Sequence, residues 1–91
     1  MTNPVGDASR VAFLELLATQ GTDCHAGGEI RRALVEEIRN EGYTMFKFAD
    51  EFAIQPGDNM RNCGFEREFE VIDAQPVARA GTFHHFEVAA S

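Results

Sequence analysis

The chain has 91 residues and a net charge of -7, and 44% of its residues are apolar, including eight Phe. This length suits one domain that buries roughly two thirds of its unfolded surface, and the apolar content argues against intrinsic disorder. With 15 acidic residues against eight basic ones, direct binding of nucleic acid through its phosphates is disfavoured. We expect a single domain over 1–91, with residues 1–6 as a flexible lead-in.

The sequence carries no signal that would direct it to or across a membrane. It has no run of 18 apolar residues, and residues 1–7 lack the basic and apolar regions of a signal peptide. We therefore expect no membrane contact and a cytoplasmic location. In that compartment Cys24 and Cys63 are expected to be free, reduced thiols.

Two amphipathic helices are expected in the first half. Asp7 or Ser9 caps a helix over about 8–20, which the stop signal Gly21 ends. A glycine-containing loop follows over 21–28. A second helix is expected over about 29–41, with charged residues on one face and an apolar stripe of Ile30, Ala33, Leu34 and Ile38 on the other.

Strand periodicity begins after Gly42. In the next residues Thr44, Phe46 and Phe48 alternate on one side of a first arm, and Phe52 and Ile54 do so on a second arm. The polar residues 49–51 between them form a connection of hairpin length. The pattern therefore predicts a β-hairpin over 42–56.

Two further strands complete the predicted fold. Residues 65–72 alternate between apolar and acidic side chains until Pro76 ends the pattern, and residues 82–88 resume the alternation. With both helices on one face of a four-stranded antiparallel sheet, the predicted fold is a two-layer α+β domain of order ααββββ. Its expected core contains Leu14, Leu17, Ile30, Leu34, Ile38, Phe46, Phe48, Phe52, Ile54, Phe69 and Phe86.

A row of carboxylates is the most distinctive feature of the third expected strand. Alternate residues of a strand lie about 6.5–7 Å apart on one face, which places Glu66, Glu68 and Glu70 in line. This row predicts a binding surface for a basic protein partner, and its other interpretation is the solvated face of a two-layer sheet. The acidic residues that would widen the predicted binding surface are Asp50, Glu51, Asp73 and Glu87.

One segment combines Glu41-Gly42-Tyr43-Thr44, Phe48, Asp50, Ile54-Gln55 and Gly57. It resembles the hairpin of a small, acidic, phage-encoded family of CRISPR inhibitors that work as DNA mimics. The resemblance covers less than a fifth of the chain. It implies an inhibitor that is encoded by a mobile element and binds a basic protein groove.

No motif for catalysis, a cofactor or a metal is present. The chain lacks a nucleophile elbow, a phosphate-binding glycine loop and a Cys-x-x-Cys or His-x-x-x-His pair. His84 and His85 are neighbours on a strand, so they face opposite sides and are not expected to share an ion. We predict no enzyme, no cofactor and no metal. The alternative is a small-ligand-binding or enzymatic α+β domain with a pocket between sheet and helices, in which His85 beside Glu70 or Glu87 is an acid–base pair.

Self-association is a further expectation. A small sheet has two unprotected edges, and Ile72 and Phe83 are expected on its outer face. A symmetric homodimer would cover these apolar side chains.

Overall fold

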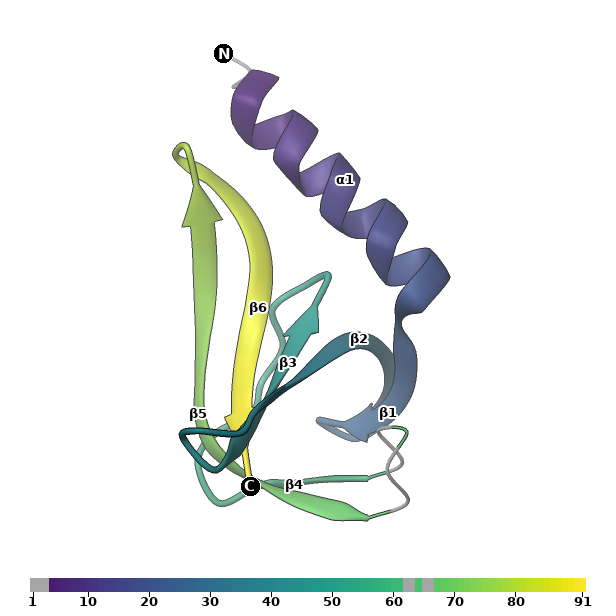
Figure 1. Cartoon of the computed structure of the whole chain (residues 1–91), viewed down its shortest axis with the longest axis vertical. Helices are drawn as coiled ribbons and strands as arrows, with labels where there is room; N and C mark the ends of the chain where they lie inside the picture. Colours follow the sequence, from purple (N-terminus) through teal and green to yellow (C-terminus); the bar gives the residue numbers. More distant parts are fainter. Residues whose placement is uncertain (1–3, 62–63, 65–66) are drawn as a thin grey trace.

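The computed structural model describes residues 4–61, 64 and 67–91. Over these residues a single helix, α1 (Pro4–Gln20), precedes six strands. The strands close an antiparallel barrel in the order β1-β2-β3-β6-β5-β4 (Figure 1). Their bounds are β1 Thr22–Ala26, β2 Glu29–Ile38, β3 Tyr43–Phe48, β4 Asn59–Arg61, β5 Glu68–Arg79 and β6 Thr82–Ala90.

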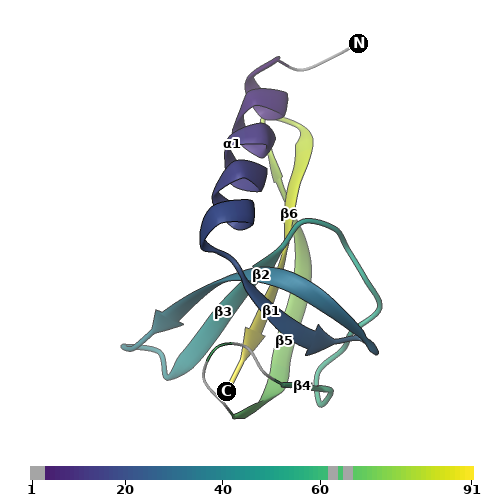
Figure 2. The same ribbon diagram turned by 90° about the vertical axis from the view of Figure 1, so that its right-hand side faces the viewer.

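The prediction of a two-layer α+β domain with two helices on a four-stranded sheet is therefore wrong. A barrel removes the free edges that an open sheet would leave, and it encloses the core within one curved sheet. The barrel has its shortest strand pairing between β1 and β4, which are joined by the single residue pair His25 and Arg61. The helix lies outside the barrel, against β6 and β2 (Figure 2).

The first predicted helix is present, and it begins at Pro4, four residues before the expected start. Proline is favoured in the first turn because its missing N–H would have no partner there. Gly6 is buried because this turn approaches the tip of the β5–β6 hairpin closely. A Cβ at Gly6 would lie 2.5 Å from the Thr82 Oγ1, so no larger residue fits without displacement.

The second predicted helix is strand β2. Gly27 and Gly28 have φ angles of 62° and 81°, and these values form a two-residue hairpin turn between β1 and β2 of the kind that twisted antiparallel strands favour. The segment predicted as a loop over 21–28 thus contains β1 and this turn. In β2, Ala33 and Val35 face the core opposite Phe48 and Phe46 of β3.

Only the first arm of the predicted 42–56 hairpin exists. Strand β3 buries Thr44, Phe46 and Phe48 on one side, as the alternation indicates. Its partners are β2 and β6 rather than residues 52–55. Phe52 and Ile54 belong to a loop and pack against the core from outside the ladder.

The two C-terminal strands form a long hairpin that extends beyond the barrel beside α1 (Figure 1). Pro76 does not end β5, because β4 covers only the start of that strand and leaves its upper part as an edge. Proline is tolerated at such an edge, where its missing N–H breaks no ladder. Ala80 and Gly81, with φ angles of 51° and 78°, make the tight turn.

The barrel core is built around aromatic side chains from three strands. Phe46 and Phe69 meet edge to face with ring centroids 5.0 Å apart. Of the predicted core residues, Ile30 is wrong, since it is 65% exposed on β2. Those that are fully buried are Leu17, Phe46, Phe48, Phe69 and Phe86, and those that are half-buried are Leu14, Leu34, Ile38, Phe52 and Ile54.

Candidate functional site

The acidic residues predicted to form one surface lie in three separate places. Glu68 and Glu70 point outward from β5, whereas Asp50 and Glu51 follow β3 near the helix. Glu87 is on β6, and it is bound to a buried histidine. Glu66 lies outside the described residues. The structure therefore brings together only part of the predicted set.

We define the β5 outer face as Glu68, Glu70, Ile72 and Asp73. A bulge between Val71 and Asp73 interrupts the pairing with β6, and as a result both Ile72 and Asp73 are exposed. Ile72, at 49% exposure, is an apolar side chain in the middle of carboxylates. On the other side of Glu68 and Glu70, the neighbouring strand β4 places Arg61 and Asn59 at the paired positions.

Glu68, Glu70 and Asp73 make no ion pair within the described residues, and neither do Asp7, Glu15, Glu41, Glu51 and Asp58. Six acidic side chains elsewhere do have one, at 2.9–3.8 Å from a basic atom. These pairs are Asp50–Arg10, Glu29–Arg31, Asp23–Arg32, Glu37–Arg39, Glu36–Lys47 and Glu87–His85. Ion pairs thus compensate six of the described acidic side chains, and on β5 the residue at the position paired with Glu68 is the basic Arg61.

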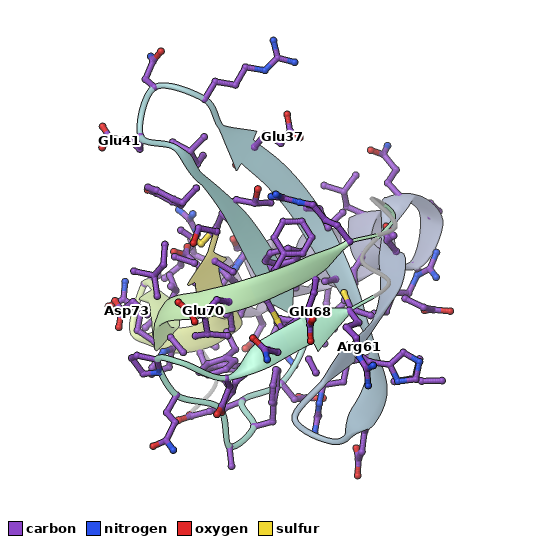
Figure 3. The ribbon with its side chains drawn as sticks, turned by 90° about the horizontal axis from the view of Figure 1, so that it is seen from below. Glu37, Glu41, Arg61, Glu68, Glu70 and Asp73 are labelled. Carbon is purple, nitrogen blue, oxygen red and sulfur yellow. The ribbon has the colours of Figure 1, made fainter. Side chains whose placement is uncertain are left out.

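Two further acidic residues lie near the tip of the β2–β3 hairpin. Figure 3 shows Glu37 and Glu41 in the upper part of the view and Glu68, Glu70 and Asp73 along β5 across the middle of it. The prediction missed them because it assigned residues 29–41 to a helix. Along the ladder Glu37 pairs with Thr44, Thr44 with Ala90 and Ala90 with Val71, so two strands, β3 and β6, separate Glu37 from β5.

A second cluster of titratable groups lies where α1 meets the upper hairpin. His84 Nδ1 is 2.7 Å from His85 Nδ1, His84 Nε2 is 3.2 Å from the Ser9 carbonyl, and His85 Nε2 is 2.9 Å from Glu87 Oε2. Phe13 of the helix packs on both imidazole rings, with centroids 5.2 Å away. His85 is 1% exposed, so this polar chain is buried under the helix.

The acceptor at one end of this chain assigns the protons. A carbonyl only accepts, so the Nε2–H of His84 donates to Ser9, and in the neutral ring His84 Nδ1 then accepts from the Nδ1–H of His85. The third link, between His85 and Glu87, also needs a proton. Each of the three links needs one proton, which is one more than two neutral rings carry.

The pKa of His84 is lowered from its usual value of 6.5. The main cause is burial, which penalises the charged ring, and the positive charges of His85, Arg79 and Arg10 add to it. Its hydrogen bond to the Ser9 carbonyl acts in the opposite direction. A neutral His84 is consistent with the proton assignment above.

Arginine side chains fasten the helix to the barrel at two further points. Arg10 donates to the carbonyls of Ala49 and His84 at 2.9 and 2.8 Å. Arg32 donates to the carbonyls of Leu17 and Ala18 at the end of α1, where the helix has unsatisfied acceptors and a negative dipole end. These guanidinium groups therefore have a structural role.

The alternative function predicted a ligand pocket between sheet and helices. Among the described residues, a half-open depression of about 210 Å³ lies beside α1, β2 and the end of β3, and it is lined by Leu17, Arg31, Arg32, Phe48, Ala49 and Asp50. His85 and Glu87 do lie together, as that alternative expected, but the helix covers the His85 ring. Among the described residues no cluster of three or more His, Cys, Asp or Glu side chains has metal-binding geometry. Cys24 is buried, and its Sγ lies 4.0 Å from the Thr22 carbonyl oxygen, whereas Cys63 lies outside the described residues.

Over the described residues the protein is a small acidic β-barrel with one external helix and exposed carboxylates on β5. No protein-family model matches the chain, and no similar protein is found among curated proteins or solved structures. In the described part of the chain, no helix has the length and apolar character needed to span a membrane.

Proposed function

We propose that this protein is an acidic protein-interaction module whose β5 outer face binds a basic surface on a protein partner. The observation that carries this proposal is the unpaired state of Glu68, Glu70 and Asp73 among the described residues, in a chain that pairs six other acids. Neighbouring like charges repel one another, so these residues contribute little to folding. A basic partner would neutralise them.

The exposed Ile72 supports the same proposal. Protein interfaces combine a desolvated apolar centre with a polar rim, and Ile72 lies between Glu70 and Asp73 on one strand. Strand β5 also has hydrogen-bonded neighbours on both sides over its first residues, so its backbone is not an edge for strand addition. Binding would therefore occur through side chains, with charge guiding the encounter.

An inhibitory action fits this mode of binding. A module that covers a basic groove excludes other anionic ligands from that groove, nucleic acid included. An inhibitor encoded by a mobile element is the specific form of the proposal, and the local sequence resemblance supports it. The predicted hairpin on which that resemblance rested is not formed, so the carboxylate face of β5 carries the argument instead.

The proposal is tested by affinity capture from the cells that express the protein, with two variants of equal charge. The first replaces the acids of the β5 outer face (Glu68→Gln, Glu70→Gln, Asp73→Asn). The second removes three acids elsewhere (Asp7→Asn, Glu15→Gln, Glu51→Gln). A specific partner should be lost with the first variant and kept with the second. Equal loss with both variants would show that only net charge matters and would contradict the proposal.

A further inference from the structure

Buried titratable side chains connect α1 to the upper part of β6, and the function proposed above does not use them. The Ser9 carbonyl of α1 lies 3.2 Å from His84 Nε2. The Nδ1 atoms of His84 and His85 lie 2.7 Å apart, and His85 Nε2 lies 2.9 Å from Glu87 Oε2. Both rings are buried, and Phe13 of α1 packs on each of them. The helix therefore shields this network from water.

The number of protons decides whether this network is hydrogen-bonded throughout. Its three links hold one proton each: His84 Nε2–H donates to the Ser9 carbonyl, His85 Nδ1–H donates to His84 Nδ1, and the last proton lies between His85 and Glu87. A fourth proton on His84 Nδ1 would place two N–H groups opposite each other across 2.7 Å, and two donors form no hydrogen bond. Protonation of His84 therefore breaks the contact between the two rings.

The charges around the network disfavour that fourth proton. The charged side chains that face the network, with the partner of one of them, come from every element packed against it: Arg10 of α1 and its partner Asp50, Arg79 of β5, Glu87 of β6, and Lys47 of β3 at the position paired with Glu87. Burial and the positive charges of His85, Arg79 and Arg10 lower the pKa of His84, whereas its hydrogen bond to Ser9 raises it. The closed form, in which α1 packs against the hairpin, therefore keeps the His84 ring neutral.

The two ends of α1 are fastened by different groups. At the C-terminal end, Arg32 donates to the carbonyls of Leu17 and Ala18, and Leu17 is buried. Neither a guanidinium group nor a carbonyl titrates near neutral pH. Nearer the N-terminus, α1 packs through Phe13 on the two histidine rings. A change of charge at His84 therefore acts on the N-terminal turns of α1 and leaves the last turn attached.

We propose that α1 is an acid-sensitive clasp, whose N-terminal turns separate from the β5–β6 hairpin when His84 takes up a proton. Separation moves the charged ring away from the Nδ1–H of His85 and into water, where its charge is solvated. The Arg10 side chain, 24% exposed in the closed form, exchanges its carbonyl acceptors for water. The barrel ladders and the contacts of Arg32 stay intact.

The effect has a definite direction and an upper limit. The pKa of His84 is lowered in the closed form from its usual value of 6.5, and the open form has that usual value. The closed form is therefore favoured fully above about pH 6.5 and loses stability as the pH falls below it. If the closed form takes up no proton, the equilibrium constant for opening rises about tenfold between pH 7.5 and 5.5.

Amide hydrogen exchange followed by NMR at pH 7.5 and 5.5 tests this proposal, after correction for the intrinsic effect of pH on exchange. Protection of the amides of residues 8–13 should fall several-fold, and at most about tenfold, because a short helix without packing is marginal in water. Amides of β2 and β3 should keep their protection. His84→Gln retains an N–H for the Ser9 carbonyl but cannot take up the proton, so it should remove the pH dependence. His25→Gln, at an exposed position on β1, should preserve it.

The histidine rings give a second test, which uses the wild-type protein alone. The chain has three histidines, and the NMR titration of the His84 ring should share its midpoint, below pH 6.5, with the shifts of the α1 amides. Titration of His84 without a change in α1 would overturn the proposal. So would equal loss of protection in α1 and the barrel, or a pH dependence that persists in His84→Gln.

Glu87→Gln tests the count of protons. Its amide N–H can donate to Nε2 of a neutral His85 and so replaces the third proton of the network. This variant should therefore keep α1 protected at pH 7.5. Loss of α1 protection at that pH would overturn the proposed network.

Discussion

We call the contact between α1 and β6, formed by Arg10, Phe13, His84, His85 and Glu87, the joint. Its charged residues differ from those of the β5 outer face in the partners that they have. At the joint, Arg10, His84, His85 and Glu87 each have a defined hydrogen-bond partner, and most of these groups are shielded from water. On β5, three carboxylates point into solvent without an ion pair in the described residues. The charged groups at the joint bind other groups of the protein, whereas for those on β5 we propose a partner.

The largest effect is expected from removing the aromatic ring at the joint. Phe13→Ala deletes a side chain that is 7% exposed and exposes the His85 ring to water, so it should cost roughly 3 kcal/mol of unfolding free energy. Urea denaturation followed by circular dichroism measures this loss. Ile72→Ala on the β5 outer face is the control and should change the free energy by less than about 0.5 kcal/mol. Similar losses for both would remove the contrast between the two regions.

A smaller loss is expected where the helix touches the hairpin tip. Gly6→Ala places a methyl group within 2.6 Å of the Thr82 side chain, and overpacking of this kind costs about 1–3 kcal/mol. Faster amide hydrogen exchange in α1, with barrel amides still protected, should accompany the loss. Ala12→Ser, on the exposed side of the same helix, is the control. An unchanged stability for Gly6→Ala would show that the helix is not held at this end.

The joint should also make stability depend on pH. The folded-state pKa of His84 is below its unfolded value of 6.5, so the unfolded chain takes up this proton first. The contribution of His84 is therefore fully present above about pH 6.5 and is lost progressively as the pH falls below it. His84→Gln should reduce this slope in urea denaturation between pH 7.5 and 5.5, and His25→Gln, at an exposed position on β1, should leave it unchanged. A slope that persists in His84→Gln would assign the effect to other groups.

The smallest effect on stability is expected from neutralising the β5 outer face. The variant with Glu68→Gln, Glu70→Gln and Asp73→Asn loses no ion pair that the described residues form, and it relieves repulsion between neighbouring carboxylates. Its unfolding free energy should stay the same or rise by about 0.5 kcal/mol or less. Thermal denaturation at low ionic strength measures this change in stability. A clear destabilisation would mean that these residues serve the fold rather than a partner.

The sequence was sufficient to locate α1, β3 and the alternation in β6, because each has a regular apolar period within a single segment. It was ambiguous for β2, where Ile30, Ala33, Leu34 and Ile38 fit a helical stripe although Ala33 and Val35 face the core. Gly27-Gly28 was the available signal, since this pair is typical of a two-residue hairpin turn. We interpreted this pair as part of a loop before a helix, and that interpretation led to the wrong fold class.

The positions of the candidate site residues were predictable only in part, because some contacts join segments that are far apart in the sequence. The outward position of Glu68 and Glu70 follows from strand alternation, and the structure shows them exposed. The approach of Ser9 to His84 joins positions 75 residues apart, and no local pattern specifies such a contact. The positions of Glu37 and Glu41 near the tip of the β2–β3 hairpin depended on knowing that β2 and β3 are paired.

The most direct test of the proposed function is the association rate with the captured partner at low and moderate salt, measured for the wild-type protein and both charge-matched variants. We expect the wild-type rate to fall steeply as salt shortens the screening length to about 8–10 Å, with a smaller change in dissociation. The variant of the β5 outer face should associate slowly at either salt concentration, and the variant with Asp7, Glu15 and Glu51 replaced should behave like the wild type. An association rate that is insensitive both to salt and to the β5 substitutions would contradict the proposal.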